Sequence, residues 1–556
     1  MKSYLLLAFC ALAFYLNSYS QNLSPAPWSH YVGSHYKTEE WSGWVRDYSR
    51  RLGNFILDSG EVVGQVDTIL IQELFQNMAS LPIEMDGTLM ATGLGRDAQK
   101  VASNLDRIEQ DSGALWRNLC RLQALKMLEL PKGKQRIFWQ IGNEISSPAY
   151  SDYLNQWAGQ NVPCGGDGCN YDPFVIPVYA EYMFAPSVQG IREASQAQFG
   201  SPDSIQIILG SLTNAGSNAA FNWLETLLNY TIDGTFAPAL KGKKVFELVD
   251  IISIHYMMGN SNSIAWRNWI DRYRDAWFGK GKIKGIWSTE EVGIRAAMNG
   301  EGAARGAANN SRYLEWAIQN QYTPTQCRTN YYAHDVGPTG SKVNDLNHEL
   351  YGFLGETPLS LVDSIFIAYD NPAIESHAFL NADSTKGVIF SFLKSAPPQA
   401  GSISEIRIMN KGMGKIQTAS GHYFSPNGHQ ILQASIQENN GSYILDYNSN
   451  VMLDSGKSVL LTLIETQPNL GPISTEELDL GKQPGFFPNP AIFQISPKNI
   501  DPFSPFEISV FDLIGNRVLH STKQEDLDIS HLPAGIFIVK IHNGNKNFTG
   551  KLLKPE

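Results

Sequence analysis

"RIFWQIGNE", residues 136–144, is an apolar run that ends on an amide and an acid. A second stretch, "GIWSTEEVG" at residues 285–293, has the same shape and also ends on acids. Near-continuous apolar runs of this length are typical of parallel strands that are buried on both faces. A carboxylate at the end of such a strand needs solvent, a partner or a chemical task, because an isolated buried charge is costly.

Further apolar runs alternate with helical stretches on both sides of these two segments. The other candidate strands begin near residues 53, 81, 205, 249 and 329, and the candidate helices lie at 97–128, 178–199 and 303–320. This alternation is typical of βαβ units, and roughly 300 residues suit a (β/α)8 barrel. We therefore predict an α/β fold with a (β/α)8 TIM barrel over residues 21–345. If 136–144 is its fourth strand, 285–293 is its seventh.

After residue 350 the pattern changes to short alternating segments separated by Gly, Asn and Ser. This pattern predicts an antiparallel β-sandwich over residues 346–467. A polar stretch rich in Gly and Pro at 468–485 is interpreted as a linker. A last small β domain is expected over residues 486–556.

The N-terminus combines Lys2 with an apolar run over residues 4–16 and small residues before Gln21. These features predict a secretory signal peptide over residues 1–20. No later stretch is apolar enough for a transmembrane segment. The net charge of −11 argues against a nucleic-acid partner, which would call for a basic face. No P-loop is present, so we expect no organic cofactor.

A Gly-rich loop, "CGGDGC", lies at residues 164–169. In an exported protein, a disulfide between Cys164 and Cys169 is favoured over two free thiols. No pair of nearby histidines completes a zinc site with these cysteines. The acidic residues of the loop lack EF-hand spacing, so no metal is assigned.

Two acids end candidate strands of the barrel, Glu144 on the fourth and Glu290 on the seventh. Functional groups in (β/α)8 barrels sit at the C-terminal ends of the strands. Hydrolysis of a glycosidic bond needs two such carboxyl groups. Glu144 alone could equally belong to a turn or a helix cap. Glu291 competes with Glu290, because neighbouring strand residues point to opposite faces and only one can face the barrel mouth.

Asn143-Glu144 after an apolar strand, and Thr289-Glu290 after "IW", resemble the signatures of the clan A glycoside hydrolases, which are retaining (β/α)8 glycosidases. The resemblance implies that Glu144 is the acid/base and Glu290 the nucleophile. It also implies that Asn143 binds the sugar 2-hydroxyl. It favours Glu290 over Glu291, which would then be a solvated or salt-bridged neighbour.

"SIHYM", residues 253–257, is similar to the His-Tyr neighbourhood of the same clan. The resemblance implies that Tyr256 or His255 hydrogen-bonds the nucleophile and lines the substrate site. The clan also carries an arginine on an early strand. That arginine is not assigned here, because Arg46, Arg50 and Arg51 precede any recognisable strand.

The last 70 or so residues contain "FFPNPA", then "ISVFDLIGNRVLHS", then "LPAGIFIVKI". "DLIGNRV" is predicted to form a hairpin turn between two alternating strands. The order and spacing resemble the type IX secretion C-terminal sorting domain of Bacteroidetes. The resemblance implies that the type IX secretion machinery is a partner and that the protein is secreted or attached to the cell surface.

The leading hypothesis is a secreted retaining glycoside hydrolase that cleaves polysaccharide or oligosaccharide substrates with two Glu residues. A non-catalytic surface glycan-binding or adhesion protein on a degenerate barrel is the alternative. The presence of both Glu residues speaks against it. A polysaccharide lyase is a third hypothesis, less favoured because lyases usually need a Tyr, His or Lys base.

Overall fold

In the computed structural model the chain forms two compact units, Met1–Asn469 and Leu470–Glu556. The structure describes the following residues: 23–35, 40–47, 87–92, 98–128, 138–158, 171–213, 215–255, 263–292, 302–331, 342–362, 366–368, 373–393, 400–409, 414–439, 442–454, 457–467, 485–487, 494–498, 506–512, 516–522, 527–543 and 546–554. The predicted signal peptide, the Cys164–Cys169 disulfide, Tyr256 and nearly all of the predicted linker lie outside these ranges.

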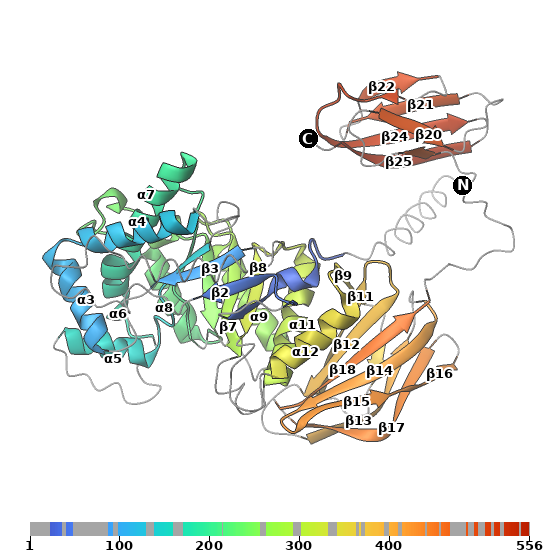
Figure 1. Ribbon diagram of the computed structural model, residues 1–556, viewed down its shortest axis with the longest axis horizontal. Coiled ribbons are helices and arrows are strands. Elements are labelled where there is room, and N and C mark those ends of the chain that lie inside the picture. The colour runs from blue at the N-terminus through green and yellow to red at the C-terminus, as the bar shows by residue number, and fades with distance from the viewer. Residues whose placement is uncertain are drawn as a thin grey trace, which may run out of the picture. The chain divides into compact units, whose positions relative to one another are not determined.

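Eight parallel strands form a closed barrel in the first unit (Figure 1). They pair in chain order, and the first also pairs with the last, Val32 opposite Thr329. The strands are β1 (Val32–His35), β2 (Trp44–Asp47), β3 (Gly87–Thr92), β4 (Phe138–Ile141), β5 (Gln206–Ile208), β6 (Ile251–His255), β7 (Gly285–Val292) and β8 (Cys327–Tyr331). The stretches "RIFWQIGNE" and "GIWSTEEVG" thus contain the fourth and seventh strands of the barrel, as their spacing predicts.

Helices alternate with the strands from β3 onward, which confirms the predicted mixed α/β pattern. They are α3 (Ala98–Gln110), α4 (Ala114–Leu128), α5 (Pro148–Trp157), α6 (Val175–Val178), α7 (Ala185–Phe199), α8 (Asn218–Asn229), α9 (Ser263–Trp277), α11 (Gly302–Asn320) and α12 (Lys342–Leu354), with a π-helical turn, η5 (Tyr179–Phe184), before α7. Most residues that connect β1, β2 and β3 lie outside the described ranges. Only eight residues separate β1 from β2, fewer than a helical crossover usually takes, and residues 40–43 form no helix. The strands close into a barrel, but the helix after every strand that a complete (β/α)8 barrel requires is not shown.

The two earliest strands differ from the sequence expectation. β1 and β2 lie near residues 32 and 44, ahead of the candidate strand near residue 53, which is outside the described ranges. Each has only four residues, "VGSH" and "WVRD", and neither forms an apolar run. A strand without an apolar run leaves no hydrophobic pattern in the sequence, so local periodicity does not reveal β1 and β2.

Aromatic rings fill one layer of the barrel interior. Trp44, Phe138 and Trp287, from β2, β4 and β7, are buried in one cluster with Ile208 and Ile251. The guanidinium of Arg328 on β8 lies over the same three rings, with distances to the ring centroids of 4.7 to 5.4 Å. Such cation–π contacts replace part of the lost hydration of the buried charge. This packed layer closes the barrel around the polar site described below.

Two antiparallel sheets follow the barrel, which confirms the antiparallel β structure expected after residue 350. One has the order β10-β13-β17-β16 and the other β15-β14-β18-β12-β11-β9. Their strands are β9 (Leu359–Leu361), β10 (Phe366–Ala368), β11 (Ile374–Asn381), β12 (Lys386–Leu393), β13 (Ala400–Met409), β14 (Ile416–Ser425), β15 (Gly428–Gln433), β16 (Ser435–Asn439), β17 (Ser442–Asp454) and β18 (Val459–Thr466). Residues of both sheets, such as Leu380 and Leu445, share one buried core.

The six-stranded sheet also packs against the barrel helices. Its outer face contributes residues such as Phe390 and Phe424 to the same buried cluster as α11 and α12, which lie beside this sheet in Figure 1. Buried charges cross this contact. Arg312 of α11 donates Nε and Nη2 to the two carboxylate oxygens of Glu375 on β11, at 2.9 and 3.1 Å. The sheet therefore has two buried faces, one towards the second sheet and one towards the barrel.

The second unit is a small β structure with its own core. Its strands are β19 (Gly485–Phe487), β20 (Gln494–Lys498), β21 (Phe506–Phe511), β22 (Arg517–Ser521), β23 (Leu527–Asp528), β24 (Gly535–Asn543) and β25 (Lys546–Lys554). β21 pairs antiparallel with β22, which confirms the hairpin predicted around "DLIGNRV". In neither unit do the described ranges contain a helix with the length and apolar content of a membrane span.

Candidate functional site

The ends of β4, β6 and β7 converge on one polar cluster. One carboxylate oxygen of Glu144, one of Glu290 and a ring nitrogen of His255 all lie within 4.8 Å of one another. The Glu290 side chain is 7% exposed and the Glu144 side chain 28% exposed. The structure therefore brings together two acids that lie on different strands, and it leaves one of them open to solvent.

Glu144 is held by an unusual turn after β4. Its φ is +50°, and that of Gly142 is +88°. Positive φ is uncommon for a residue with a side chain, and such conformations concentrate at functional sites. A Cβ at Gly142 would collide with the methyl group of Met183 and lie 2.8 Å from Cγ2 of Ile145. Gln140 braces the turn by donating Nε2 to the carbonyl of Gly142 at 2.7 Å.

A β-bulge in β7 decides which of the two adjacent acids faces the barrel interior. Ile254 of β6 pairs with Ser288, but the next residue, His255, pairs with Glu290, so one extra residue stands in β7. Trp287 points into the barrel, and strict alternation would then place Glu291 on the same side. The extra residue reverses this alternation, as bulges do where they re-aim a side chain.

Glu291 consequently faces outward, towards α11. It is 1% exposed, and Asn309 donates Nδ2 to its Oε2 at 3.0 Å. Of the two alternatives expected for Glu291, a solvated or a salt-bridged neighbour, burial excludes the solvated one, because α11 covers this face of the barrel. The structure places Glu290, and not Glu291, in the cluster with Glu144.

Arg46 on β2 links the strand ends of β4 and β7. Its Nη1 donates to Glu290 Oε2 at 3.0 Å, and its Nη2 donates to Oδ1 of Asn143. Arg46 is fully buried. Its charge offsets that of Glu290, and its planar fork fixes two acceptors at once. This residue could not be assigned from the sequence, because β2 forms no apolar run.

His255 joins Glu144 to a layer of hydroxyl groups beneath the site. Its Nδ1 lies 3.3 Å from Glu144 Oε1, and its Nε2 lies 2.8 Å from Thr289 Oγ1. The Thr289 hydroxyl is in turn 2.6 Å from Ser253 Oγ. His255 therefore contacts the residue expected to be the acid/base, and a ring nitrogen of it also lies within 4.8 Å of an oxygen of Glu290, the expected nucleophile. Tyr256, the other candidate for a hydrogen bond to the nucleophile, lies outside the described residues.

The cluster has ligand types that could hold a divalent metal ion, namely two carboxylates and an imidazole. Arg46 opposes that use, because its guanidinium already lies against Glu290 and would repel a second cation. The arrangement is better suited to proton transfer and nucleophilic attack by carboxylates. Asn143 fits the same use: its oxygen accepts from Arg46, so its Nδ2 is the group that can donate to a substrate hydroxyl.

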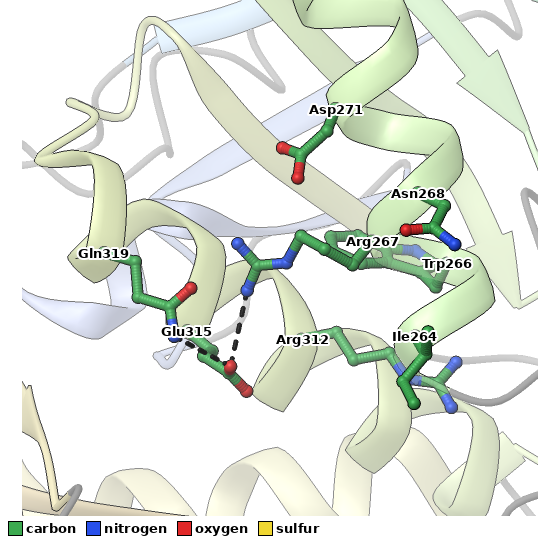
Figure 2. A pocket seen from close by; sticks show the side chains of 8 residues that line it. All are labelled: Ile264, Trp266, Arg267, Asn268, Asp271, Arg312, Glu315 and Gln319. Atoms are coloured by element: carbon green, nitrogen blue, oxygen red, sulfur yellow. Dashed lines mark hydrogen bonds and ion pairs between the residues drawn. The ribbon is translucent and has the colours of Figure 1, made fainter.

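A separate pocket of about 400 Å³ lies on the outside of the barrel, between α9 and α11 (Figure 2). Its lining includes Arg267, Asp271 and Glu315, and Arg267 donates to Glu315 at 3.4 Å. None of the predicted site residues lines it.

The C-terminal unit matches a known family. The model of the secretion system C-terminal sorting domain matches residues 485–555. This match confirms the resemblance of the C-terminal region to a type IX sorting domain. The protein is therefore exported by the type IX route to the cell surface or the medium. No curated protein matches the chain.

Several solved structures resemble the chain at low identity. A Paenibacillus polymyxa xyloglucanase from glycoside hydrolase family 44 is 10% identical, with a TM-score of 0.41, over 80% of this chain and 98% of that chain. A bifunctional glucanase-xylanase from a metagenome library is 11% identical, with a TM-score of 0.41, over 80% of this chain and 98% of that chain. A β-porphyranase of glycoside hydrolase family 86 from Bacteroides plebeius is 11% identical, with a TM-score of 0.38, over 84% of this chain and 85% of that chain. Similarity at this level establishes no activity for this chain.

Proposed function

We propose that this protein is an exported retaining glycoside hydrolase built on a (β/α)8 barrel, which cleaves glycosidic bonds in a polysaccharide or oligosaccharide. The observation that carries the proposal is the approach of Glu144 and Glu290, because one carboxylate oxygen of each lies within 4.8 Å of the other. Retaining glycosidases hold their carboxyl groups about 5 to 5.5 Å apart, whereas inverting ones need roughly 6.5 to 9.5 Å to admit a water.

Glu290 is the proposed nucleophile. It is almost fully buried, and Arg46 donates a charge-assisted hydrogen bond to one of its oxygens at 3.0 Å. That contact orients the carboxylate and places a positive charge beside it. The other oxygen can attack the anomeric carbon and displace the leaving sugar, which forms a covalent glycosyl-enzyme.

Glu144 is the proposed acid/base. As a carboxylic acid it protonates the leaving glycosidic oxygen, and as a carboxylate it then takes a proton from the water that hydrolyses the intermediate. Its greater exposure suits a group that must meet a leaving group and then a water. His255, anchored on Thr289 at 2.8 Å, positions this carboxyl group.

The domain boundaries derived from the sequence form part of the proposal. The barrel over 21–345 and the sandwich over 346–467 would act as one catalytic body, since α11 and α12 pack on the six-stranded sheet. A linker over 468–485 would then separate this body from the sorting domain at 486–556.

The proposal is tested with the purified full-length chain on a panel of polysaccharides, with product analysis. We expect turnover of at least one polysaccharide, and loss of that turnover in Glu290→Gln. Glu291→Gln is the matched control, because its amide oxygen can still accept from Asn309, and it should keep most of the activity. Binding of a polysaccharide without turnover in the wild-type protein would instead support the glycan-binding alternative.

A further inference from the structure

Three potential metal ligands meet where α12 packs on the six-stranded sheet (Figure 1). Glu349 comes from α12, His422 from β14 and His429 from β15. Phe424 pairs with His429, and His422 lies two residues before Phe424 on the same strand. Residues two apart share a face of a strand, so both histidines lie on one face of the sheet. Phe424 is buried in the cluster shared with the barrel helices, which identifies that face as the one towards α12.

The separations of the ligand atoms are those of a metal site. His422 Nδ1 lies 3.2 Å from Glu349 Oε2 and 3.2 Å from His429 Nε2. Two ligands bound about 2.05 Å from a zinc ion at the tetrahedral angle would be about 3.3 Å apart. Glu349 Oε1 and His429 Nδ1 lie 3.8 Å apart. That contact uses the other nitrogen of His429, and one ligand atom from each of the three residues lies within 4.8 Å of the other two.

Neighbouring side chains orient the two imidazoles for binding a cation. Ser420 Oγ lies 3.3 Å from His422 Nε2, so it can accept the Nε2 proton and leave the Nδ1 lone pair towards Glu349 and His429. The Phe424 ring stacks on His429 at 4.3 Å between centroids and 8° between planes, which holds the imidazole plane. A lone pair that faces a carboxylate oxygen at 3.2 Å is repulsive unless a positive charge lies between them.

We infer that Glu349, His422 and His429 bind one zinc ion, with a water as the fourth ligand, and that this ion joins α12 to the sandwich sheet. The ligand set of two imidazoles and one carboxylate is one that zinc commonly takes. Exposure rises across the site, from 9% for the His422 side chain to 22% for His429 and 36% for Glu349. The ion can thus enter from solvent. This site is independent of the proposed glycosidase activity.

The test uses the full-length chain, stripped of metal with a chelator and dialysed. Zinc is titrated by calorimetry, and cobalt(II) by visible absorption, which reports tetrahedral coordination. We expect one zinc ion per chain that raises the melting temperature. The cobalt complex should have intense tetrahedral bands and no thiolate charge-transfer band, which separates this site from the cysteines. His429→Gln and Glu349→Gln should each weaken zinc binding by at least about 100-fold, and Ser420→Ala by about 10-fold.

His348→Gln is the matched control. His348 is adjacent to Glu349 on α12 and also pairs with a glutamate, Glu40, at 2.8 Å, but that pair is exposed. Its loss should leave zinc affinity unchanged. Zinc binding of equal strength in wild type, His429→Gln and Glu349→Gln would overturn the inference, as would a wild-type chain without tetrahedral cobalt bands. In that case the cluster is an ion pair between α12 and the sheet, without a metal.

Discussion

Arg46 and Glu290 lie 244 residues apart in the chain, yet Nη1 of the arginine donates to Oε2 of the glutamate at 3.0 Å. The same guanidinium donates to Asn143 on the far side of the cluster. One buried cation on β2 therefore holds the residues that follow β4 and the end of β7 in a fixed relation. The proposed mechanism depends on these two hydrogen bonds, because they fix the position of Glu290 relative to Asn143, the neighbour of Glu144.

Replacement of Arg46 by lysine should keep the charge but lose the fork that reaches both acceptors. We expect kcat/KM to fall on the order of 100-fold, in the range seen when one preorganised donor is removed from an active site. Turnover measurements with circular dichroism on the same sample check this prediction. Near wild-type turnover in Arg46→Lys would show that charge alone suffices and that the bond to Asn143 is dispensable.

Gly142→Ala should damage both stability and turnover. The new methyl group would meet Ile145 and Met183, and alanine is strained at a φ of +88°. Gly200→Ala separates these effects, because Gly200 has a φ of +71° and open space around its Cβ position. We expect Gly200→Ala to cost about 1 kcal/mol in unfolding free energy without loss of turnover. Gly142→Ala should cost more and also lower kcat/KM, because it displaces Glu144. Equal effects of the two substitutions would show that the turn does not position Glu144.

Glu181, in the π-helical turn η5, should make the protein less stable as pH rises. Burial raises the pKa of Glu181 to about 7, and the charge of nearby Asp233 adds to the shift. Because the folded-state pKa lies above the unfolded one, stability is lost between about pH 4.5 and 7 as the carboxyl group ionises. At pH 8, Glu181→Gln should increase the unfolding free energy by up to about 3 kcal/mol, which is measured as a higher melting temperature. At pH 4 the substitution should have little effect on either quantity. A variant less stable than wild type at pH 8 would contradict this assignment.

His377 should stabilise the contact between barrel and sandwich most strongly at acidic pH. Burial alone lowers the pKa of His377, but hydrogen bonds to Glu315 and Glu375, at 2.6 and 2.8 Å, outweigh it and leave the pKa raised. A raised pKa contributes stability that is fully present below about pH 6.5, the unfolded value, and is lost as pH rises through the folded value.

We therefore expect the melting-temperature difference between wild type and His377→Gln to be largest near pH 5 to 6 and to shrink at alkaline pH. The same network lowers the pKa of Glu375 to about 2, against the effect of burial, through His377 and Arg312. Its contribution is thus lost only as pH falls below about 4.5. His348→Gln, at an exposed pair, should cause little change at any pH. A His377→Gln effect that does not depend on pH would indicate packing in place of charge.

The acids of the site could be predicted from sequence because β4 and β7 carry long apolar runs that end on them. Arg46 could not, because its strand, "WVRD", forms no apolar run and only the closed barrel brings it to Glu290. The choice between Glu290 and Glu291 depends on one extra residue in β7, and no local pattern marks a bulge of this kind. Glu349, His422 and His429 were missed for a similar reason, since they meet only when α12 packs on the sheet.

The central claim is that Glu290 is the nucleophile and Glu144 the acid/base of a retaining mechanism. Glu290→Ala should remove nearly all turnover and leave a cavity beside the anomeric carbon. A small external anion such as azide can then attack from the same side. Glu144→Ala should spare substrates with good leaving groups, which need little protonation, and azide should there give a product of retained configuration.

The most direct measurement is the anomeric configuration, by proton NMR, of the glycosyl azide that Glu290→Ala forms from an activated glycoside of the sugar that the polysaccharide panel identifies. The account predicts partial recovery of turnover and a product of inverted configuration, because azide takes the place of the missing carboxylate in a single displacement. Full activity of Glu290→Ala without azide, or a rescued product of retained configuration, would contradict it.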